Sequence, residues 1–481
     1  MAMTQYEVVI GLEVHAELMT KSKMFCSCSA DFFGAAPNTH VCPVCLAMPG
    51  ALPVINKEAV AQTIRAGLAL NCTIAEDVRF ERKNYTYPDL PKGYQISQYE
   101  LPQAINGWLE IDTPAGPKRI GITRAHLEED TGKLVHENGV SLVDYNRAGV
   151  PLLEIVSEPD MRSIEEVNEY LTRLRQLLIY IGASTGDLEK GAMRMEANVS
   201  LRPVGSQELG TKVEIKNLNS FRAVRNALAY EIARQERILR AGGKVDQVTL
   251  GWLEQEGRTY VQRSKEDAHD YRYFPEPDLP PLHIDRAWVD ELAASLPELP
   301  RAKRQRFVDQ YGLSVKDADI LTSERPIADY FDALVSEAGD ALPPKKIANW
   351  VMGDLFRLVN ESSQSIAEIP VTPAKFAALL KLVAEKTINA NTASQVLKRM
   401  FKTGEDAKTI VEQEGLAQVS DANALAQMVD RLIAEHPEEV ARYRAGKTQL
   451  FGWFVGQIMR ETRGKANPDI VRQLLKEHLE A

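Results

Sequence analysis

The segment VVIGLEVHAEL, residues 8–18, decides how the first half of the chain folds, because its side chains alternate in polarity. Interpreted as a β-strand, it carries aliphatic side chains on one face and places Gly11, Glu13, His15 and Glu17 on the other. A carboxylate and an imidazole two residues apart on one face can together bind a metal ion or a phosphate. A solvated face of an antiparallel sheet shows the same alternation, and this segment alone favours that simpler interpretation.

Two further segments, residues 194–202 and 212–217, alternate in the same way and are also predicted to be strands. Their polar faces combine basic, acidic and amide side chains, namely Arg194, Glu196, Asn198, Ser200, Arg202, Lys212, Glu214 and Lys216. Because Lys and Arg neutralise phosphates and carboxylates hold Mg²⁺, three such faces suit a nucleotide with its metal ion. An exposed antiparallel face remains the alternative.

Charged residues also gather at two other places in this half of the chain. The run Glu128-Glu129-Asp130 follows a predicted strand at 120–127, and three carboxylates at a strand end indicate a metal site. The stretch Arg82-Lys83-Asn84-Tyr85 adds a basic pair beside an aromatic ring.

The cysteines predict a structural zinc site. Cys26-x-Cys28 is followed after thirteen residues by Cys42-Pro-Val-Cys45, so that four thiolates come in two close pairs, as tetrahedral Zn²⁺ requires. Four free thiols are the alternative. Cys72 stands apart and is expected to be a core residue.

Length and composition limit the remaining possibilities. The chain has 481 residues, more than one core normally holds, and a net charge of −10, so it can bind RNA only through local basic patches. No apolar run approaches the ~20 residues that span a bilayer, and no secretory signal is visible. The odd number of cysteines, five, fits a reducing compartment, and we expect a cytoplasmic protein.

The chain changes character near Leu282, and this predicts an α+β protein. Before that point short period-2 runs dominate, whereas from Asp285 onward apolar residues recur at helical spacing. Within the first part, helices are expected after Ser163, which begins a capping box with Glu166, and from Ala223 to Arg240. We predict a domain at 1–286 built on a mixed or antiparallel sheet, with the zinc knuckle inserted at 26–45. An all-helical middle domain at 287–405 and a small helical tail at 406–481 follow.

Several motifs in this order resemble one known family, the B subunits of the bacterial tRNA-dependent amidotransferases. The matching stretches are Val9–His15, Arg82–Tyr85, Tyr94–Gln98, Gly121–Arg124, Glu128–Asp130, Pro151–Pro159, Glu214–Phe221 and Asp270–Pro275. The tail also looks like the helical tRNA-binding module of this family. The resemblance covers nearly the whole chain.

The resemblance implies an activity, cofactors and partners. The family uses ATP and Mg²⁺ to phosphorylate the side-chain carboxylate of misacylated Glu-tRNA(Gln) or Asp-tRNA(Asn), and ammonia then displaces the phosphate to form Gln-tRNA(Gln) or Asn-tRNA(Asn). A separate amidase (glutaminase) chain supplies the ammonia, and a small third chain completes the heterotrimer. The non-discriminating aminoacyl-tRNA synthetase is a further candidate partner. No glycine- and serine-rich amidase stretch occurs in this chain, which fits that division of labour.

By resemblance, the first domain is the cradle of the family, with Mg²⁺ held by His15, Glu129 and Glu214, Glu13 close by and Lys83 near the phosphates. These five residues form the predicted catalytic set. Simple alternation puts Glu128 rather than Glu129 in phase with Arg124, but the family pattern favours Glu129, which we choose. The predicted nucleotide contacts are Gly11, Lys83, Arg194 and Lys212. The cysteine quartet is not universal in this family, so zinc is argued from spacing alone.

The tail offers basic residues around Phe451, Trp453 and Phe454. The predicted tRNA contacts are Arg442, Arg444, Lys447, Arg460, Arg463 and Lys465. A solvated helix face over an aromatic core is the alternative, and it explains the aromatic residues better. A competing function for the whole chain is a non-catalytic, zinc-containing, tRNA-binding scaffold whose ATP site has decayed.

Overall fold

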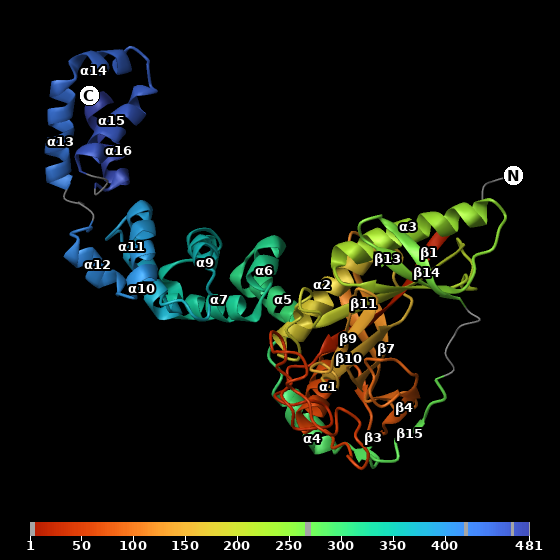
Figure 1. Ribbon diagram of the computed structural model, residues 1–481. Coiled ribbons are helices and arrows are strands. Elements are labelled where there is room, and N and C mark those ends of the chain that lie inside the picture. The colour runs from red at the N-terminus through yellow and green to blue at the C-terminus, as the bar shows by residue number, and fades with distance from the viewer. Residues whose placement is uncertain (1–4, 265–270, 418–421, 463–465, 481) are drawn as a thin grey trace. The chain divides into compact units, whose positions relative to one another are not determined.

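A computed structural model describes residues 5–264, 271–417, 422–462 and 466–480. The chain divides into two compact units, Met1–Leu299 and Pro300–Ala481 (Figure 1). The first unit contains the sheets and the second is helical, which confirms the predicted α+β class.

Among the described residues, the first unit is built on a nine-stranded sheet that is antiparallel except between β12 and β13. In spatial order its strands are β14 (Arg258–Ser264), β13 (Val248–Leu253), β12 (Val213–Leu218), β11 (Met193–Pro203), β1 (Tyr6–Glu17), β10 (Pro151–Ser157), β7 (Gly116–Glu129), β6 (Ala104–Thr113) and β2 (Thr73–Ile74). The predicted strands at 8–18, 120–127, 194–202 and 212–217 are therefore confirmed, with β1 at the centre.

One face of this sheet forms the core of the unit. Leu12, Val14 and Ala16 of β1 are fully buried there, against a layer of helices α1 (Lys57–Ala69), α2 (Ile164–Tyr180) and α3 (Phe221–Arg240). Ser163 and Ser220 accept hydrogen bonds from backbone N–H groups in the first turns of α2 and α3, which explains where both helices begin. Because the apolar residues of β1 face the helices, its polar residues must point away from them.

Smaller sheets and one more helix complete the first unit. A three-stranded sheet joins β15 (Phe274–Pro275), β4 (Glu81–Asn84) and β5 (Tyr94–Ser97), and β16 (Leu282–His283) pairs with β3 (Asp77–Val78). A separate hairpin joins β8 (Lys133–Glu137) and β9 (Val140–Asp144). Helix α4 (Arg286–Ala294) packs against α1, so the unit continues to Leu299, past the predicted boundary at residue 286.

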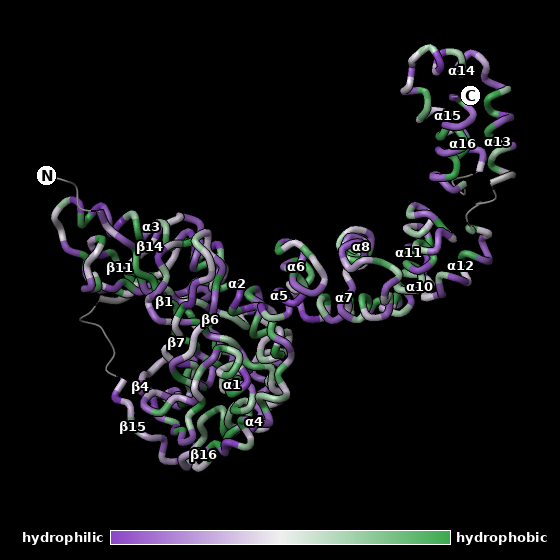
Figure 2. The backbone as a smooth tube through the Cα atoms, turned by 180° about the vertical axis from the view of Figure 1, so that it is seen from behind, coloured by the Kyte–Doolittle hydropathy of each residue, from purple (hydrophilic) through white to green (hydrophobic). Residues whose placement is uncertain are grey.

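The second unit is helical throughout its described residues. The α-helices are α5 (Pro300–Tyr311), α6 (Val315–Leu321), α7 (Arg325–Ala338), α8 (Pro344–Trp350), α9 (Phe356–Ser362), α10 (Pro373–Ala384), α11 (Ala390–Thr403), α12 (Ala407–Gln413), α13 (Ala422–Glu435), α14 (Pro437–Arg444), α15 (Leu450–Glu461) and α16 (Pro468–Glu480). Short 3₁₀ and π segments occupy Gly339–Ala341 and Val351–Leu355. Polar and apolar positions alternate along these helices (Figure 2), as expected of amphipathic segments.

The end of the second unit has an apolar cluster of its own, which runs from Leu425 to Leu479 and includes Phe454. Helix α12 packs instead against α10 and α11. The predicted division at residues 405 and 406 stays a prediction. None of the described helices combines the length and the apolar character that a bilayer-spanning helix needs.

Candidate functional site

The open face of the large sheet carries a row of charged side chains at its centre. His15 on β1 pairs with Glu154 on β10 and with Arg194 on β11, and Glu154 pairs in turn with His126 on β7. Directly paired residues point to the same face of a sheet, so the strand register alone brings these four side chains together.

The first group of potential metal ligands consists of His15, Glu128 and Glu154, whose ligand atoms all lie within 4.8 Å of one another. His15 Nε2 is 3.4 Å from Glu154 Oε2 and 3.9 Å from Glu128 Oε2. Glu128 is held in place because Gln95 Nε2 and Ser97 Oγ donate hydrogen bonds to its two oxygens at 3.0 and 2.6 Å.

The carboxylates of this group are charged although they are buried. Burial by itself opposes the charged form of Glu154, but the nearby imidazoles of His126 and His15 outweigh it and hold the pKa of Glu154 well below its usual range. Burial also opposes protonation of His15, yet its contact with Glu154 raises the pKa of His15 to about 9. With His15 protonated, the two carboxylates still leave this group with a net negative charge, and a cation bound through the imidazole would displace its proton.

The second group lies one row further along the same face and consists of Glu13, Glu196 and Glu214, again within 4.8 Å of one another. Glu13 and Glu196 are directly paired across β1 and β11. Lys216 Nζ lies 2.7 Å from Glu196 and 3.4 Å from Glu214. Burial and the neighbouring carboxylates Glu154 and Glu196 raise the pKa of Glu13.

Five of these six residues, all except Glu214, line one polar cavity of about 350 Å³. Lys83 reaches it from β4, and Tyr85 and Tyr271 line it as well. Burial opposes the charge on Lys83, but the carboxylates of Glu128 and Glu154 outweigh it and raise the pKa of the lysine. Lys83 is thus a fixed cation facing a cluster of anions.

The donor sets fit hard divalent cations. Each group offers oxygen ligands, and the first adds an imidazole nitrogen, within the short mutual distances that one ion can bridge. His126 Nε2 lies 3.5 Å from Glu128 and 3.5 Å from Glu154, so it contacts both carboxylates.

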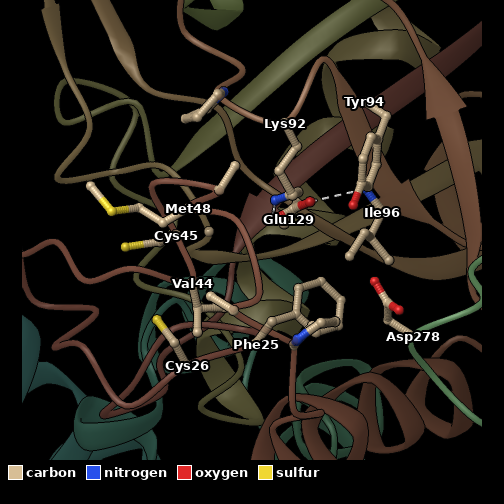
Figure 3. A pocket seen from close by; sticks show the side chains of 15 residues that line it. Phe25, Cys26, Val44, Cys45, Met48, Lys92, Tyr94, Ile96, Glu129 and Asp278 are labelled. Atoms are coloured by element: carbon tan, nitrogen blue, oxygen red, sulfur yellow. Dashed lines mark hydrogen bonds and ion pairs between the residues drawn. The ribbon is translucent and has the colours of Figure 1, made fainter.

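Glu129, the predicted ligand, lies on the other side of β7. Lys92 Nζ is 2.6 Å from its carboxylate, and the backbone N–H of Ile96 donates to it at 3.0 Å. Figure 3 shows this carboxylate with Lys92 and Ile96, in a separate cavity of about 230 Å³. The structure therefore does not bring Glu129 together with His15 and Glu214. Alternation along β7 instead places Glu128 beside His15 and Glu154, and which of the two neighbours binds a metal stays a prediction.

The predicted nucleotide contacts are only partly brought together. Lys83 and Arg194 line the polar cavity, and Arg194 Nη2 is 2.8 Å from Asp130 Oδ2. Gly11 is buried beside Pro159, and Lys212 is an exposed residue before β12; neither lines the cavity. His15 and Glu214 belong to different ligand groups, and Glu13 belongs with Glu214.

The sequence interpretation did not select Glu154 and Glu196 as site residues. Glu154 has a visible signal, since it is the single charged residue in the otherwise apolar strand Pro151–Val156, where a carboxylate is costly without a partner. His126 has no such signal, because Arg124, Glu128 and Glu129 stand close to it in β7. Which carboxylates share one ion depends on strand order, which the sequence does not display.

The cysteine cluster has the geometry predicted from its spacing. All four Sγ atoms of Cys26, Cys28, Cys42 and Cys45 lie within 4.8 Å of one another, and Cys42 and Cys45 Sγ are 3.8 Å apart. A tetrahedron with Zn–S bonds of about 2.3 Å has edges of about 3.8 Å. The backbone N–H of Cys42 donates to Cys45 Sγ at 3.1 Å. A hydrogen bond with the thiol of Cys26 lowers the pKa of Cys45 to about 4. The donor set fits Zn²⁺. Cys72 is a buried core residue, as expected.

The basic residues of the tail lie mostly on the surface. Arg442, Arg444, Lys447 and Arg460 are all exposed, and Arg444 Nε also donates to the carbonyl of Leu479 at 3.1 Å, which closes the end of α16. Phe454 is fully buried in the local apolar cluster, and Phe451 and Trp453 pack against that cluster. The aromatic residues are thus core residues. Arg463 and Lys465 lie outside the described residues.

Comparison with known proteins gives matches along the whole chain. Residues 8–290 match the family model described as GatB/GatE catalytic domain, and residues 329–479 match the GatB domain. The chain is 54% identical over 476 residues to the B subunit of an aspartyl/glutamyl-tRNA(Asn/Gln) amidotransferase from Thermoanaerobacter pseudethanolicus, covering 99% of both chains. It is 54% identical over 479 residues to the protein of that name from Moorella thermoacetica, covering 99% of this chain and 100% of the relative.

Proposed function

The chain belongs to the GatB family of tRNA-dependent amidotransferase B subunits, and we propose that its polar cavity is where ATP activates the substrate carboxylate. The observation that carries this proposal is the pair of ligand groups, His15/Glu128/Glu154 and Glu13/Glu196/Glu214, of which all members but Glu214 line one cavity beside Lys83. Membership in the family implies ATP use.

The reaction has two steps. An oxygen of the side-chain carboxylate of Glu-tRNA(Gln) or Asp-tRNA(Asn) attacks the γ-phosphorus of ATP, the bond to the β-phosphate oxygen breaks, and ADP leaves. The nitrogen of ammonia then attacks the acyl carbon, and inorganic phosphate leaves with the electrons of the C–O bond. The products are Gln-tRNA(Gln) or Asn-tRNA(Asn), ADP and phosphate, with a proton released from the ammonia nitrogen.

The residues of the cavity address the main obstacle to the first step, which is that both reactants are negative. Bound Mg²⁺ would supply positive charge at the phosphates, held by His15, Glu128 and Glu154, with Glu13, Glu196 and Glu214 as a second ligand group. Lys83 would pair with the transferring phosphoryl group, and Arg194 stands at the same cavity. Fixed positions for these charges avoid the reorganisation that water would need.

A test uses the purified complex with Glu-tRNA, ATP and glutamine. Glu128→Ala or His15→Ala should remove formation of Gln-tRNA while glutamine hydrolysis by the partner continues. Amidation near the wild-type level in both variants would overturn the assignment of the cavity. Repeating the assay with Asp-tRNA decides which of the two tRNAs is a substrate.

We also propose the partners and the location. Ammonia would come from an amidase (glutaminase) chain, a small third chain would complete the heterotrimer, and the non-discriminating aminoacyl-tRNA synthetase would deliver the misacylated tRNA in the cytoplasm. The structural Zn²⁺ would be held by the four clustered cysteines. The exposed Arg442, Lys447 and Arg460 would contact the tRNA backbone. The competing function, a non-catalytic scaffold, is not favoured, because the family match covers the catalytic domain and both ligand groups are intact.

A further inference from the structure

Two tyrosines from distant parts of the sequence stand together at the polar cavity. Tyr85 follows β4 and Tyr271 precedes β15, and both line the cavity that also holds His15, Glu128 and Glu154. Their ring centroids are 5.9 Å apart at an angle of 70°, an edge-to-face pair. Both residues are only partly buried.

The backbone that carries Tyr271 is held in an unusual conformation. The neighbouring Arg272 has a φ of +43°, a region that non-glycine residues rarely adopt. Asn84, at the end of β4, stabilises this conformation. Its backbone N–H and its Nδ2 donate to the carbonyl of Tyr271 at 3.0 and 3.1 Å. Its Nδ2 also donates to the carbonyl of Arg272 at 2.9 Å. Strain that several hydrogen bonds enforce is typical of a ligand-binding site.

The next residues fasten the same two segments. Phe274 pairs with Arg82 across β15 and β4, and the guanidinium of Arg82 makes two hydrogen bonds of 2.8 Å to the buried Glu276. The segments 82–85 and 271–276 therefore form one structural unit, which fixes the rings of Tyr85 and Tyr271 at the cavity.

Tyr85 and Tyr271 together form an aromatic wall of the cavity, and Lys83 lies between this wall and the ligand groups. Its ammonium lies 5.1 Å from the centroid of the Tyr271 ring, and its charge also interacts with Glu128 and Glu154. From the carboxylates outward, the order is thus metal ligands, a cation and then aromatic rings. A nucleotide has the same order, with metal-bound phosphates at one end and a flat base at the other.

We propose that Tyr85 and Tyr271 bind the base of an adenosine by stacking, with Asn84 as the residue that positions Tyr271. This inference rests on the proposed function, which brings two adenosines to the site: the nucleoside of ATP and the 3′-terminal adenosine of the aminoacylated tRNA. Asn217 and Asn219 also line the cavity, and their amides can donate to and accept from the edge of a base.

A second tyrosine pair nearby shows what a purely structural contact looks like. Tyr99 and Tyr273 stack on each other at 4.4 Å with an interplanar angle of 11°, so each covers a face of the other, and neither lines the cavity. The rings of Tyr85 and Tyr271 instead meet edge to face, and Tyr271 also contacts the ring of Tyr273 at 6.0 Å and the ammonium of Lys83 at 5.1 Å.

The experiment measures steady-state amidation by the intact complex as ATP and Glu-tRNA are varied separately. Tyr271→Ala and Tyr85→Ala should each raise one KM by about 5- to 100-fold, the range for loss of one base–aromatic stack, with a smaller change in kcat. Tyr271→Phe keeps the ring and should stay within about twofold of the wild type. Tyr87→Ala removes an exposed tyrosine outside the cavity and serves as the matched control.

Varying ATP and Glu-tRNA separately distinguishes the two possible sources of the adenosine. A raised KM for ATP alone assigns the wall to the nucleotide, and a raised KM for Glu-tRNA alone assigns it to the tRNA end. If both KM values stay within twofold in both alanine variants while the wild type is active, the inference is wrong although the proposed function stands. If the wild type itself does not amidate with ATP, the proposed function fails first.

A folding defect is separated by a second substitution. Tyr271→Leu keeps apolar volume but has no aromatic face, and glutamine hydrolysis by the partner reports assembly of the complex. If the alanine variant does not assemble, the leucine variant is judged by the same criteria. Equal KM values for the leucine variant and the wild type would then overturn the inference.

Discussion

The cysteine cluster and the acidic cavity both gather potential metal ligands, but they are assembled in different ways. The four cysteines come from twenty consecutive residues, Cys26–Cys45. The ligands of the cavity come from β1, β7, β10, β11 and β12, between Glu13 and Glu214. The first site is a property of local spacing, whereas the second is a property of strand order and register.

This difference predicts different responses to change. The cavity requires every strand to keep its register, because a slip of one residue would turn each ligand to the opposite face. Irregularities in pairing occur beside it, between Met195 and Ala197 on β11 and between Val156 and Ser157 on β10. The cysteine cluster needs only its own loops to be correctly folded.

The largest expected effect tests the register directly. Glu154→Gln should lower kcat/KM for amidation by about 100-fold or more, since it removes one charged ligand beside His15. Glu129→Gln, on the opposite side of the sheet, should leave the magnesium dependence of the rate unchanged. Titration of activity with Mg²⁺ in the two variants is the measurement. A shifted magnesium dependence in Glu129→Gln but not in Glu154→Gln would restore the assignment of Glu129.

The next effect concerns the cysteine cluster and its stability. Cys45→Ser should reduce the zinc content from about one per chain to near zero and lower the thermal unfolding midpoint by several degrees, because binding of a structural metal is coupled to folding. Amidation measured well below the new midpoint should persist. Cys72→Ala changes a cysteine outside the cluster and should leave the zinc content unchanged. Metal analysis that finds no zinc in the wild type would contradict the site.

A smaller effect concerns the tail, where the proposed contacts are neither chelating nor buried. Arg442→Ala with Lys447→Ala should weaken tRNA binding and reduce the slope of log Kd against log salt by about two, one per lost phosphate contact. Lys476→Ala, an exposed lysine on α16, is the matched control. Identical salt slopes for the double variant and the wild type would show that these residues do not contact RNA.

The smallest expected effect concerns an ordinary ion pair that lies outside both the cysteine cluster and the acidic cavity, and it serves as a baseline for the other predictions. Asp332 on α7 contacts Arg306 and Tyr311 of α5; burial opposes its charge, but the hydrogen bond from Arg306 outweighs it and lowers the pKa of Asp332. A lowered pKa in the folded state stabilises the protein above the unfolded value of about 3.9, and this contribution disappears as the pH falls below it. The wild type should therefore unfold at a higher temperature than Asp332→Asn at pH 7, and the difference should shrink as the pH falls from about 4 through the lowered pKa of the folded state. A difference that stays constant over this range would show that the effect is not electrostatic.

Several features of the fold and of the site were predictable from the sequence. The alternation of residues 8–18 predicted a strand with His15 and Glu13 on its polar face, and β1 has this arrangement. Helices α2 and α3, the helical second half and the convergence of the four cysteines followed from periodicity, capping residues and spacing. These features depend on interactions between residues close in sequence, so the sequence displays them directly.

The grouping of the ligands was decided only by the tertiary structure. Whether Glu128 or Glu129 joins His15 depends on which face of β7 meets the cavity, and the pairing of His15 with Glu154 depends on β10 lying between β1 and β7. Likewise, only pairing between β4 and β15 brings Tyr85 to Tyr271. The sequence by itself determined the strands, their polar faces and the cysteine cluster. Strand order and register decided which polar residues meet, because those contacts join residues that are far apart along the chain.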